Sequence, residues 1–450
     1  SSRLGFIMLS VGCAVGLGNV WRFPFITGQY GGALFVIIYI LFLVIFGIPV
    51  MTMEFAVGRG SGKSAARSFH VLEKTGTKWH LFGWAAMAGN YLLMMFYTTI
   101  SGWMLAYMVK SAAGVFDGLS PEEVGGVFNA LTASPASCAG WMTTATVLGF
   151  TVCAGGLEKS VEKITKVMMS CLFIILLVLV IRSVTLEGAA AGLAFYLKPN
   201  LGAIREHGLW TVVYAAMGQA FFTLSLGVGS MAIFGSYLGK DRRLFGESVA
   251  IAGLDTAVAL MSGFVIFPAC FAFNVNPGQG PGLVFVTLPN IFNAMSFGRI
   301  WGTLFFVFMA FAAMSTVVAV FENIIAFGMD ITGCSRKKSC FINFIIVTLL
   351  SLPCALGFNL LSGVQPLGPG SMILDLEDFI VSNNLLPLGS IVYLLFCVSK
   401  KGWGWDSFIK EANMGSGWSF PAALRPYLTW GLPVLIILVF VFGYINKFAK

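Results

Sequence analysis

The chain has 450 residues, of which 58% are hydrophobic and only 10% are charged. Soluble domains average roughly 45–50% apolar and about 25% charged residues, so a soluble protein of this size could not cover its surface with these charges. The composition therefore predicts an all-α polytopic membrane protein, because each helix satisfies its backbone groups within its own segment. A transmembrane barrel would show alternating segments of about ten residues, whereas this chain shows uninterrupted apolar stretches.

Eleven apolar segments are long enough to cross a bilayer, which requires about 20 largely apolar residues. In chain order they are 4–28, 33–58, 82–112, 139–157, 160–185, 208–237, 246–274, 297–329, 339–358, 371–398 and 427–448. The polar connections between them are too short to bury a core of their own. Residues 1–450 should therefore form a single transmembrane domain.

The basic residues set the predicted orientation. If the N-terminus is cytoplasmic, 19 Lys and Arg fall in segments on that side and seven on the other, while Arg22 lies within the first span. Lysine and arginine are enriched in cytoplasmic loops. We therefore expect a multi-pass protein of the plasma (cytoplasmic) membrane, with its N-terminus cytoplasmic and its C-terminus extracellular.

Charge and cysteine content argue against other functions. The net charge of +8 is explained by the cytoplasmic loops, so we expect no nucleic-acid partner. The nine cysteines have no CxxC spacing and no histidine partners, which implies neither a disulfide framework nor a cysteine metal site. The sequence contains no nucleophile elbow, HExxH motif or Walker loop. We expect neither an enzyme nor an organic cofactor.

Two of the predicted spans carry unusual glycine clusters. The first reads GCAVGLGNVWRFP from Gly12, and the sixth reads GQAFFTLSLGVGS from Gly218. Glycine inside a helix costs about 1 kcal/mol relative to alanine, and non-helical backbone at membrane depth is tolerated only where it lines a protein-enclosed cavity. For either segment alone, close helix packing through small residues is an equal alternative. The two spans open five-helix halves, 1–185 and 208–398, which favours the discontinuous helices of an inverted-repeat transporter.

These segments resemble a known family of transporters. GCAVGLGNVWRFPFITGQYGG, GIPVMTMEFAVGR and GQAFFTLSLGVGS are similar to the signature segments of the neurotransmitter:sodium symporter family, and the likeness runs through the first ten spans. The resemblance implies a LeuT-like fold, a 5+5 inverted repeat with discontinuous helices 1 and 6, with an additional eleventh span at 427–448. Eleven spans resemble the common bacterial form.

The resemblance also implies a substrate site at the two breaks. In the family, backbone N–H groups of the first break bind an amino acid's carboxylate, and here these would be Leu17 and Gly18. Tyr97 matches the third-helix tyrosine whose hydroxyl reaches the same carboxylate. Monoamine carriers have an aspartate at the position of Gly16, so glycine favours a substrate that brings its own carboxylate. The implied substrate residues are Ala14, Gly16, Leu17, Gly18, Leu93, Tyr97, Phe222, Thr223, Ser225, Val228 and Val320. None is charged, and Val228 replaces a larger side chain of some relatives, so we expect a neutral, hydrophobic L-amino acid.

Two sodium sites are implied in the same way. The first would use the Ala14 carbonyl, Asn19, Thr223 and the seventh-helix Asp255, together with the substrate carboxylate. The second would use the carbonyls of Gly12, Val15 and Ala312 with the hydroxyls of Ser315 and Thr316. Taken alone, a Ser-Thr pair in a membrane helix more often bonds back to its own helix. The family likeness favours the sodium role.

The acids inside the spans differ in their predicted roles. Asp255 stands where many relatives have a sodium-binding asparagine, and Ala259 stands where chloride-dependent relatives have a serine. Acids inside a membrane are costly and are functional candidates by default. We therefore expect Asp255 to supply the negative charge that chloride supplies elsewhere; the alternative is a protonated, hydrogen-bonded acid. Glu54 and Glu322 we interpret as structural.

Gate residues form a third predicted group. Arg22 lies four residues after Gly18, and Asp378 matches the acid with which relatives pair this arginine above the substrate. Asp375, one helical turn away, is a rival acid. Asp330 matches the cytoplasmic gate acid, whose arginine partner would precede residue 1.

Together these features predict a sodium-coupled, chloride-independent symporter of neutral L-amino acids that works by alternating access. The alternative is a non-transporting amino-acid sensor or a channel on the same fold, although a channel would need a continuous polar pore. The expected partners are the amino acid, sodium ions and the lipid bilayer. We expect a monomer or a weak dimer.

Overall fold

The computed structural model describes residues 3–277 and 282–448, whose regular elements are almost entirely helical. The α-helices are α1 Arg3–Ala14, α2 Phe23–Gln29, α3 Ala33–Phe42, α4 Ile48–Ser61, α5 Ala65–Leu72, α6 Leu81–Ala112, α7 Pro121–Ala133, α8 Pro135–Ala154, α9 Glu162–Val184, α10 Ala189–Leu197, α11 Gly202–His207, α12 Leu209–Thr223, α13 Ser230–Tyr237, α14 Leu244–Ala272, α15 Leu288–Ala294, α16 Gly298–Thr332, α17 Arg336–Leu356, α18 Ile373–Ile380, α19 Leu386–Val398, α20 Trp405–Ala412 and α21 Leu432–Phe448. Short π-helical or 3₁₀ turns are η1 Gly18–Arg22, η2 Leu43–Gly47, η3 Leu157–Val161, η4 Leu283–Thr287, η5 Val381–Leu385, η6 Ala422–Leu424 and η7 Tyr427–Gly431. The predicted all-helical class is confirmed.

The observed spans follow the predicted ones closely. Among the described residues, nine helices are long and apolar enough to cross a bilayer, and α1 with η1 and α2 makes a tenth that is bent by 49°. The remaining predicted span corresponds to α12 and α13, of 15 and 8 residues, each too short to cross alone. Helix ends differ from prediction by a few residues; the fourth span is Pro135–Ala154 rather than 139–157.

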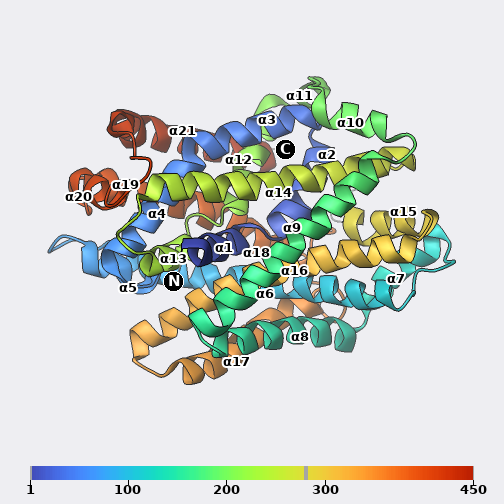
Figure 1. Cartoon of the computed structure of the whole chain (residues 1–450), viewed down its shortest axis with the longest axis horizontal. Helices are drawn as coiled ribbons and strands as arrows, with labels where there is room; N and C mark the ends of the chain where they lie inside the picture. Colours follow the sequence, from blue (N-terminus) through green and yellow to red (C-terminus); the bar gives the residue numbers. More distant parts are fainter. Residues whose placement is uncertain (1–2, 278–281, 449–450) are drawn as a thin grey trace.

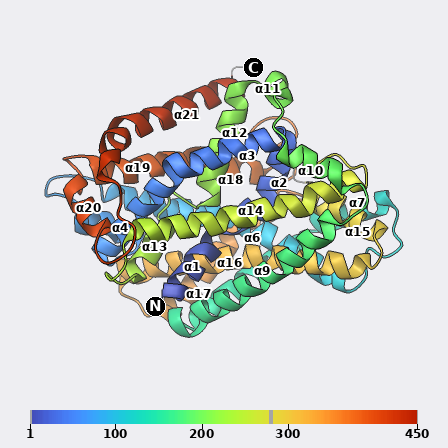
Figure 2. The same cartoon turned by 45° about the horizontal axis from the view of Figure 1, so that its top comes forward.

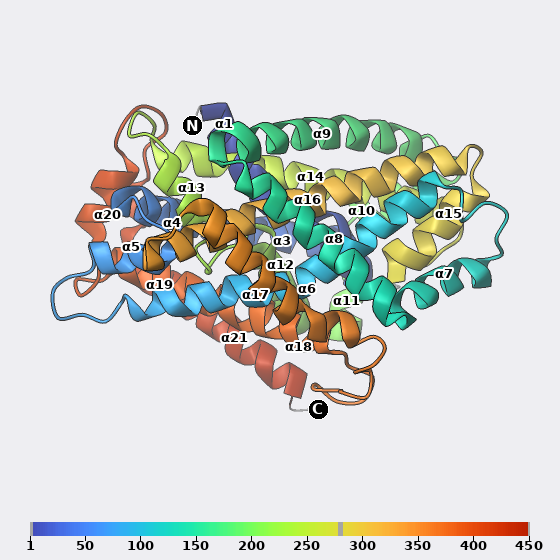
Figure 3. The ribbon, with the colours of Figure 1, turned by 90° about the horizontal axis from the view of Figure 1, so that it is seen from below.

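The connecting segments gather at two opposite ends of the helix bundle (Figures 1–3). The short helices α5 and α20, from segments predicted to face the cytoplasm, lie at one end. The short helices α7 and α15, from segments predicted to lie outside, are found at the other. The grouping of the loops thus agrees with the predicted topology, while the end that faces the cytoplasm stays a prediction.

Both predicted helix breaks are present. After α1 ends at Ala14, the chain leaves the α-helical path before it resumes with η1. Between α12 and α13, the residues Ser225, Gly227 and Gly229 have φ angles of 51°, 93° and 74°. A Cβ atom on Gly227 would lie 2.2 Å from the Leu386 carbonyl oxygen, so the left-handed backbone and the close approach both require glycine there.

At the α5 end of the bundle, one buried arginine joins three segments. Arg59, near the end of α4, donates from Nε to Glu411 Oε1 of α20 at 2.7 Å. Its Nη1 donates to the carbonyls of Arg242 at 2.6 Å and Gly239 at 3.3 Å in the turn before α14. The Arg59 and Glu411 side chains are only 2% and 9% exposed. This guanidinium therefore fixes α20 against the transmembrane bundle.

Arg59→Ala should lower the free energy of unfolding by about 3–5 kcal/mol, because it leaves the Glu411 carboxylate buried without its cation. The apparent melting temperature of the detergent-solubilised protein, followed by tryptophan fluorescence, measures the effect. Arg242→Ala is the matched control, because the Arg242 side chain is 39% exposed and pairs only loosely with Asp241 at 3.9 Å; it should change stability by less than about 1 kcal/mol. Equal melting of the two variants would contradict the structural role of Arg59.

Candidate functional site

The two helix breaks face one another across a small enclosed cavity. Its lining comes from the end of α1, the start of η1, and parts of α6, α12, α16 and α19. The lining residues are Cys13, Ala14, Gly18, Leu93, Tyr97, Phe222, Ser225, Thr316 and Leu386. The free volume of the cavity is about 10 Å³, close to the smallest space that holds one water molecule. Unwound backbone and the hydroxyls of Tyr97, Ser225 and Thr316 thus meet apolar side chains, the combination expected of a site for a small amphiphilic ligand.

Tyr97 fixes one end of the cavity. Its hydroxyl accepts a hydrogen bond from the Leu17 backbone N–H at 2.8 Å, so the hydroxyl proton stays available for a ligand. A Cβ atom on Gly16 would lie 2.2 Å from this hydroxyl and 2.3 Å from Thr316 Oγ1. The absence of a side chain at Gly16 is what lets α6 and α16 approach the unwound segment.

The cavity contains most, but not all, of the residues predicted to bind substrate. Leu17 and Gly16 lie at its edge through their contacts with Tyr97, and six others line it directly. The six are Ala14, Gly18, Leu93, Tyr97, Phe222 and Ser225.

Three predicted substrate residues lie outside the lining. The break at 224–229 turns Val228 towards Gly89 of α6, and the Val228 carbonyl accepts from Asn90 Nδ2 at 2.8 Å. The Thr223 hydroxyl points to Asp255, and Val320 is fully buried within the helix packing of α16. The apolar part of the cavity lining thus contains fewer residues than predicted, because Val228 and Val320 are not among them.

Sequence reasoning missed several residues of the cavity. Leu386, at the start of α19, reaches it from a distant part of the chain, and no pattern in the sequence indicates this. Cys13 contributes through a carbonyl that accepts from Thr316 Oγ1 at 3.2 Å. Gln219 lies beside the lining rather than in it: its Nε2 donates to the carbonyl of Gly18 at 2.7 Å, while its buried Oε1 has no hydrogen-bond partner among the described residues. A polar residue within the GQAFF segment was the available signal for Gln219.

Asp255 lies at the centre of the first predicted sodium site. Its Oδ1 accepts from Asn19 Nδ2 at 2.8 Å and its Oδ2 accepts from the Thr223 hydroxyl at 2.9 Å. Asn19 Oδ1 in turn accepts from the Gly16 N–H at 3.1 Å. All three side chains are completely buried. Carboxylate, hydroxyl and amide oxygens are the donors that hard cations prefer, so this group fits sodium chemically. Ala14, also predicted for this site, lies in the cavity lining.

The second predicted sodium site is a convergence of five oxygens between the first break and α16. Ser315 Oγ lies 2.9 Å from the Ala312 carbonyl and 3.3 Å from the Val15 carbonyl. Thr316 Oγ1 lies 3.3 Å from the carbonyls of both Gly12 and Val15. A hydroxyl has one proton to donate, so at most two of these four oxygen pairs are hydrogen bonds at any one time. Such a cluster of acceptors is suited to a cation.

The outer gate residues meet through an intermediary. Arg22 Nη1 lies 3.7 Å from Asp378 Oδ1, and it donates to the Ser382 hydroxyl at 2.9 Å, which donates to Asp378 at 2.5 Å. The Arg22 guanidinium also lies 4.6 Å from the ring centre of Phe222, which lines the cavity. The rival Asp375 accepts from the Met372 N–H at the start of α18. Arg22 and Asp378 thus separate the cavity from a larger hollow above it, of about 470 Å³.

Asp330 has partners that the sequence did not indicate. Its Oδ2 accepts from the backbone N–H and the hydroxyl of Ser64, at 3.0 and 2.6 Å, and Lys63 Nζ lies 3.6 Å from its Oδ1. Ser64 precedes α5, so Asp330 ties the end of α16 to the start of that helix. Glu322, interpreted as structural, pairs with Arg336 and accepts from the Tyr237 hydroxyl at 3.1 Å.

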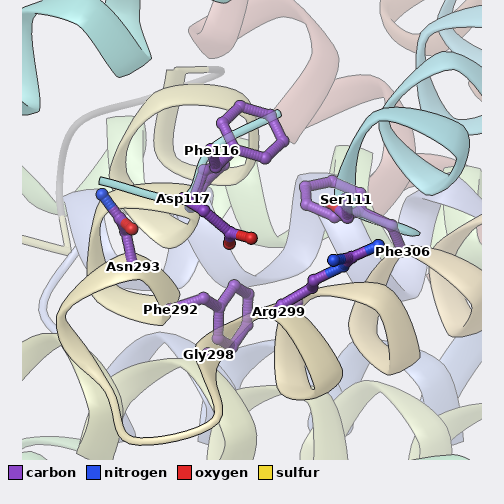
Figure 4. Close-up of a pocket in the computed structure, with 10 residues that line it drawn as sticks. Ser111, Phe116, Asp117, Phe292, Asn293, Gly298, Arg299 and Phe306 are labelled. Atoms are coloured by element: carbon purple, nitrogen blue, oxygen red, sulfur yellow. The ribbon is translucent and has the colours of Figure 1, made fainter. Parts of the chain in front are cut away.

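Another cavity, of about 20 Å³, lies at the α7–α15 end of the bundle (Figure 4). Arg299 of α16 donates to the Ala112 carbonyl from Nε at 3.0 Å and from Nη2 at 2.5 Å, and so satisfies a free carbonyl in the last turn of α6. Asn293 Nδ2 donates to the Leu119 carbonyl at 2.7 Å. Figure 4 shows the Asp117 carboxylate between these two side chains. None of the predicted site residues lines this cavity.

Two broken helices around an enclosed cavity, flanked by clusters of oxygen donors, define the class of secondary transporters built on discontinuous membrane helices. The chain belongs to the Sodium:neurotransmitter symporter family, whose sequence profile matches residues 1–117 and 133–449. It is thus a multi-pass, sodium-dependent transporter of that family.

Relatives and a solved structure agree with this assignment. An uncharacterized sodium-dependent transporter of Bacillus subtilis is 34% identical over 98% of this chain and 96% of its own. One from Methanocaldococcus jannaschii is 30% identical over 94% of this chain and 87% of its own. The crystal structure of MhsT in complex with L-phenylalanine has a TM-score of 0.89 and 39% identity, and the match covers 98% of this chain and 99% of that one. The predicted LeuT-like fold is confirmed by this match.

Proposed function

We propose that the protein is a sodium-coupled symporter of neutral, hydrophobic L-amino acids. The main support is the cavity between the two helix breaks, where the Tyr97 hydroxyl lies beside the free backbone of the first break and Leu93, Phe222 and Leu386 supply apolar surface. Among the residues that the structure describes, no ionisable acid or base other than buried Cys13 and Tyr97 lines it, so a charged substrate side chain would lose hydration without gaining a partner. The bound L-phenylalanine of the similar MhsT structure supports the same substrate class.

Two sodium ions would bind in the two oxygen clusters, the first around Asp255 and the second between the first break and α16. The first cluster contains Asn19, which accepts a hydrogen bond from the Gly16 N–H. This cluster therefore lies next to the backbone that would hold the substrate carboxylate. A carboxylate shared between ion and substrate couples their binding directly. The fixed charge of Asp255 is the reason we propose that transport needs no chloride.

The driving force is sufficient for this coupling. One charge that crosses a potential of 100 mV gains about 2.3 kcal/mol, and a tenfold concentration gradient adds roughly 1.4 kcal/mol. Two sodium ions that carry a zwitterion would supply about 7 kcal/mol, which corresponds to roughly five decades of substrate accumulation.

Alternating access is the proposed mechanism. Arg22, Ser382 and Asp378 would close over the cavity when ions and substrate are bound, and Asp330 with Ser64 would hold the opposite side shut. The Arg22 and Asp378 side chains are 11% and 32% exposed and their charged atoms lie 3.7 Å apart. Because their shorter contacts run through the Ser382 hydroxyl, the gate would open by the movement of a few side-chain hydrogen bonds.

The decisive experiment is sodium-dependent amino-acid binding by the purified protein, competed with each of the twenty amino acids. We expect apolar L-amino acids to compete best, and only with sodium present. If none competes, or if sodium is dispensable, the proposal is wrong. Counterflow in vesicles separates a carrier from the alternative sensor or channel, because only a carrier exchanges trapped substrate for labelled substrate outside.

Tyr97→Phe should weaken substrate binding by about 10–100-fold, since a hydrogen bond to a charged group contributes about 1.5–3 kcal/mol. The affinity for the best competing amino acid at saturating sodium measures the loss. The matched control is Tyr427→Phe. The Tyr427 hydroxyl donates to the Ile45 carbonyl at 2.9 Å, at a position outside the cavity. Unchanged affinity in Tyr97→Phe would exclude this hydroxyl as a substrate ligand.

A further inference from the structure

The end of α5 and the loop that leads to α6 carry a group of side chains that the transport mechanism does not use. The chain has only three histidines, and two of them, His70 and His80, lie on either side of Glu73. One ligand atom from each of the three residues lies within 4.8 Å of the other two. His80 Nδ1 is 2.5 Å and His70 Nδ1 is 3.6 Å from the same carboxylate oxygen, Glu73 Oε1.

We propose that His70, Glu73 and His80 form a binding site for a divalent transition metal of the zinc class. Two imidazole nitrogens and one carboxylate oxygen are a ligand set used by zinc, with bond lengths of about 2.0–2.2 Å and the fourth position left to water. A tetrahedral site of that size separates its ligand atoms by about 3.4 Å. The distance between His70 and Glu73 already fits, and the contact between His80 and Glu73 has to widen by about 1 Å.

The carboxylate is already oriented for this role. Glu73 Oε2 accepts from the Thr77 hydroxyl and from the His80 backbone N–H, both at 3.2 Å, which leaves Oε1 turned to the two imidazole rings. Burial acts to raise the pKa of Glu73, but the hydrogen bonds from His80 and Thr77 lower it overall, so the carboxylate is ionised at neutral pH. Outer hydrogen bonds of this kind orient ligands in metal sites.

The site is accessible without a change of fold. The side chains of His70 and His80 are 66% and 36% exposed, whereas that of Glu73 is 9% exposed. The nearby cation Lys74 donates from Nζ to the Lys400 carbonyl at 2.6 Å, and its ammonium group is thereby held at the segment after α19. A metal ion can therefore reach the rings from solvent, while the acid remains anchored in the loop.

A bound metal would join the end of α5 to the start of α6. The loop is also bonded to the segment after α19, because Trp79 Nε1 donates to the Lys401 carbonyl at 3.0 Å, and Figure 3 shows α5 and α19 at the same end of the bundle. The other end of α5 is preceded by Ser64, which bonds the predicted gate acid Asp330. This step rests on the proposed transport function: zinc bound at this end of the bundle should slow the transport cycle, because it would restrain α5.

Titration of zinc into the purified full-length protein, freed of any histidine tag, tests the site by calorimetry. We expect one saturable zinc ion per chain, no comparable binding of magnesium, which favours oxygen ligands, and at least a tenfold loss of zinc affinity in His70→Ala and in Glu73→Gln. His207→Ala is the matched control and should bind zinc as the unaltered protein does. Absence of saturable zinc binding, or equal binding by His70→Ala and the unaltered protein, would overturn the proposal.

Two further measurements keep the outcome interpretable. Sodium-dependent amino-acid binding by His70→Ala reports that the variant is folded, and it should be unchanged. Zinc trapped inside vesicles should slow counterflow by the unaltered protein and not by His70→Ala. Because zinc binding is measured without substrate or sodium, it succeeds or fails independently of the transport function.

Discussion

Asp255→Asn is expected to lower sodium affinity by at least about 100-fold and to abolish transport in chloride-free medium. The variant replaces a completely buried carboxylate, whose two oxygens accept from Asn19 and Thr223, with an amide that has one acceptor and a donor group. That donor group would face either the Asn19 amide or the Thr223 hydroxyl, both of which donate hydrogen bonds to Asp255. Removing the charge opposite a buried cation costs about 3–5 kcal/mol, which corresponds to a loss of roughly 10²–10⁴-fold.

The chloride dependence of this variant separates a charge role from a structural one. In Asp255→Asn combined with Ala259→Ser, external chloride should restore part of the uptake, because the pair recreates the side chains of chloride-dependent relatives. The unaltered protein should transport equally well in chloride and in gluconate, and the exposed Asp241→Asn serves as the matched control. Uptake by the unaltered protein that requires chloride would refute the proposed charge compensation, as would full activity of Asp255→Asn without chloride.

The helix breaks could be predicted because their cause is local. Glycine clusters lower helix stability in the segment that contains them, and Gly227 and Gly229 do adopt the left-handed backbone that glycine permits. The positive φ of Ser225 has no such local cause. Ser225 lies two residues before Gly227 in the same break. The same turn points Val228 at α6, so the observed cavity lining lacks this predicted residue.

Residues that act through distant contacts were harder to predict. Ser382 bridges Arg22 and Asp378, and Ser64 bonds Asp330, because helices far apart in sequence pack together there. Serine is common at helix ends and in turns, so neither position stands out in the sequence. Leu386 enters the cavity for the same reason. Residue types at single positions indicated the chemistry of the site, whereas its shape depends on tertiary packing.

Gly16→Ala should reduce sodium-dependent substrate binding by more than about 100-fold while the protein remains folded. The added methyl carbon would lie 2.2 Å from the Tyr97 hydroxyl and 2.3 Å from Thr316 Oγ1, far inside any real carbon–oxygen contact. Either α6 or α16 has to shift, or both side chains have to rotate. Rotation of Tyr97 breaks its bond with the Leu17 N–H, and rotation of Thr316 removes an oxygen from the second sodium cluster. One methyl group therefore disturbs the proposed substrate site and the proposed sodium site together.

The joint effect distinguishes this variant from Tyr97→Phe, which should weaken substrate binding alone. Sodium titrations at fixed substrate, and substrate titrations at fixed sodium, should both shift for Gly16→Ala. Gly253→Ala is the matched control, because Gly253 is an exposed glycine of α14 with no neighbouring atom within 4 Å of the added carbon. A Gly16→Ala protein that binds sodium and substrate normally would mean that the unwound segment can move away from Tyr97 and Thr316. The close packing of these three residues would then not determine ion and substrate binding.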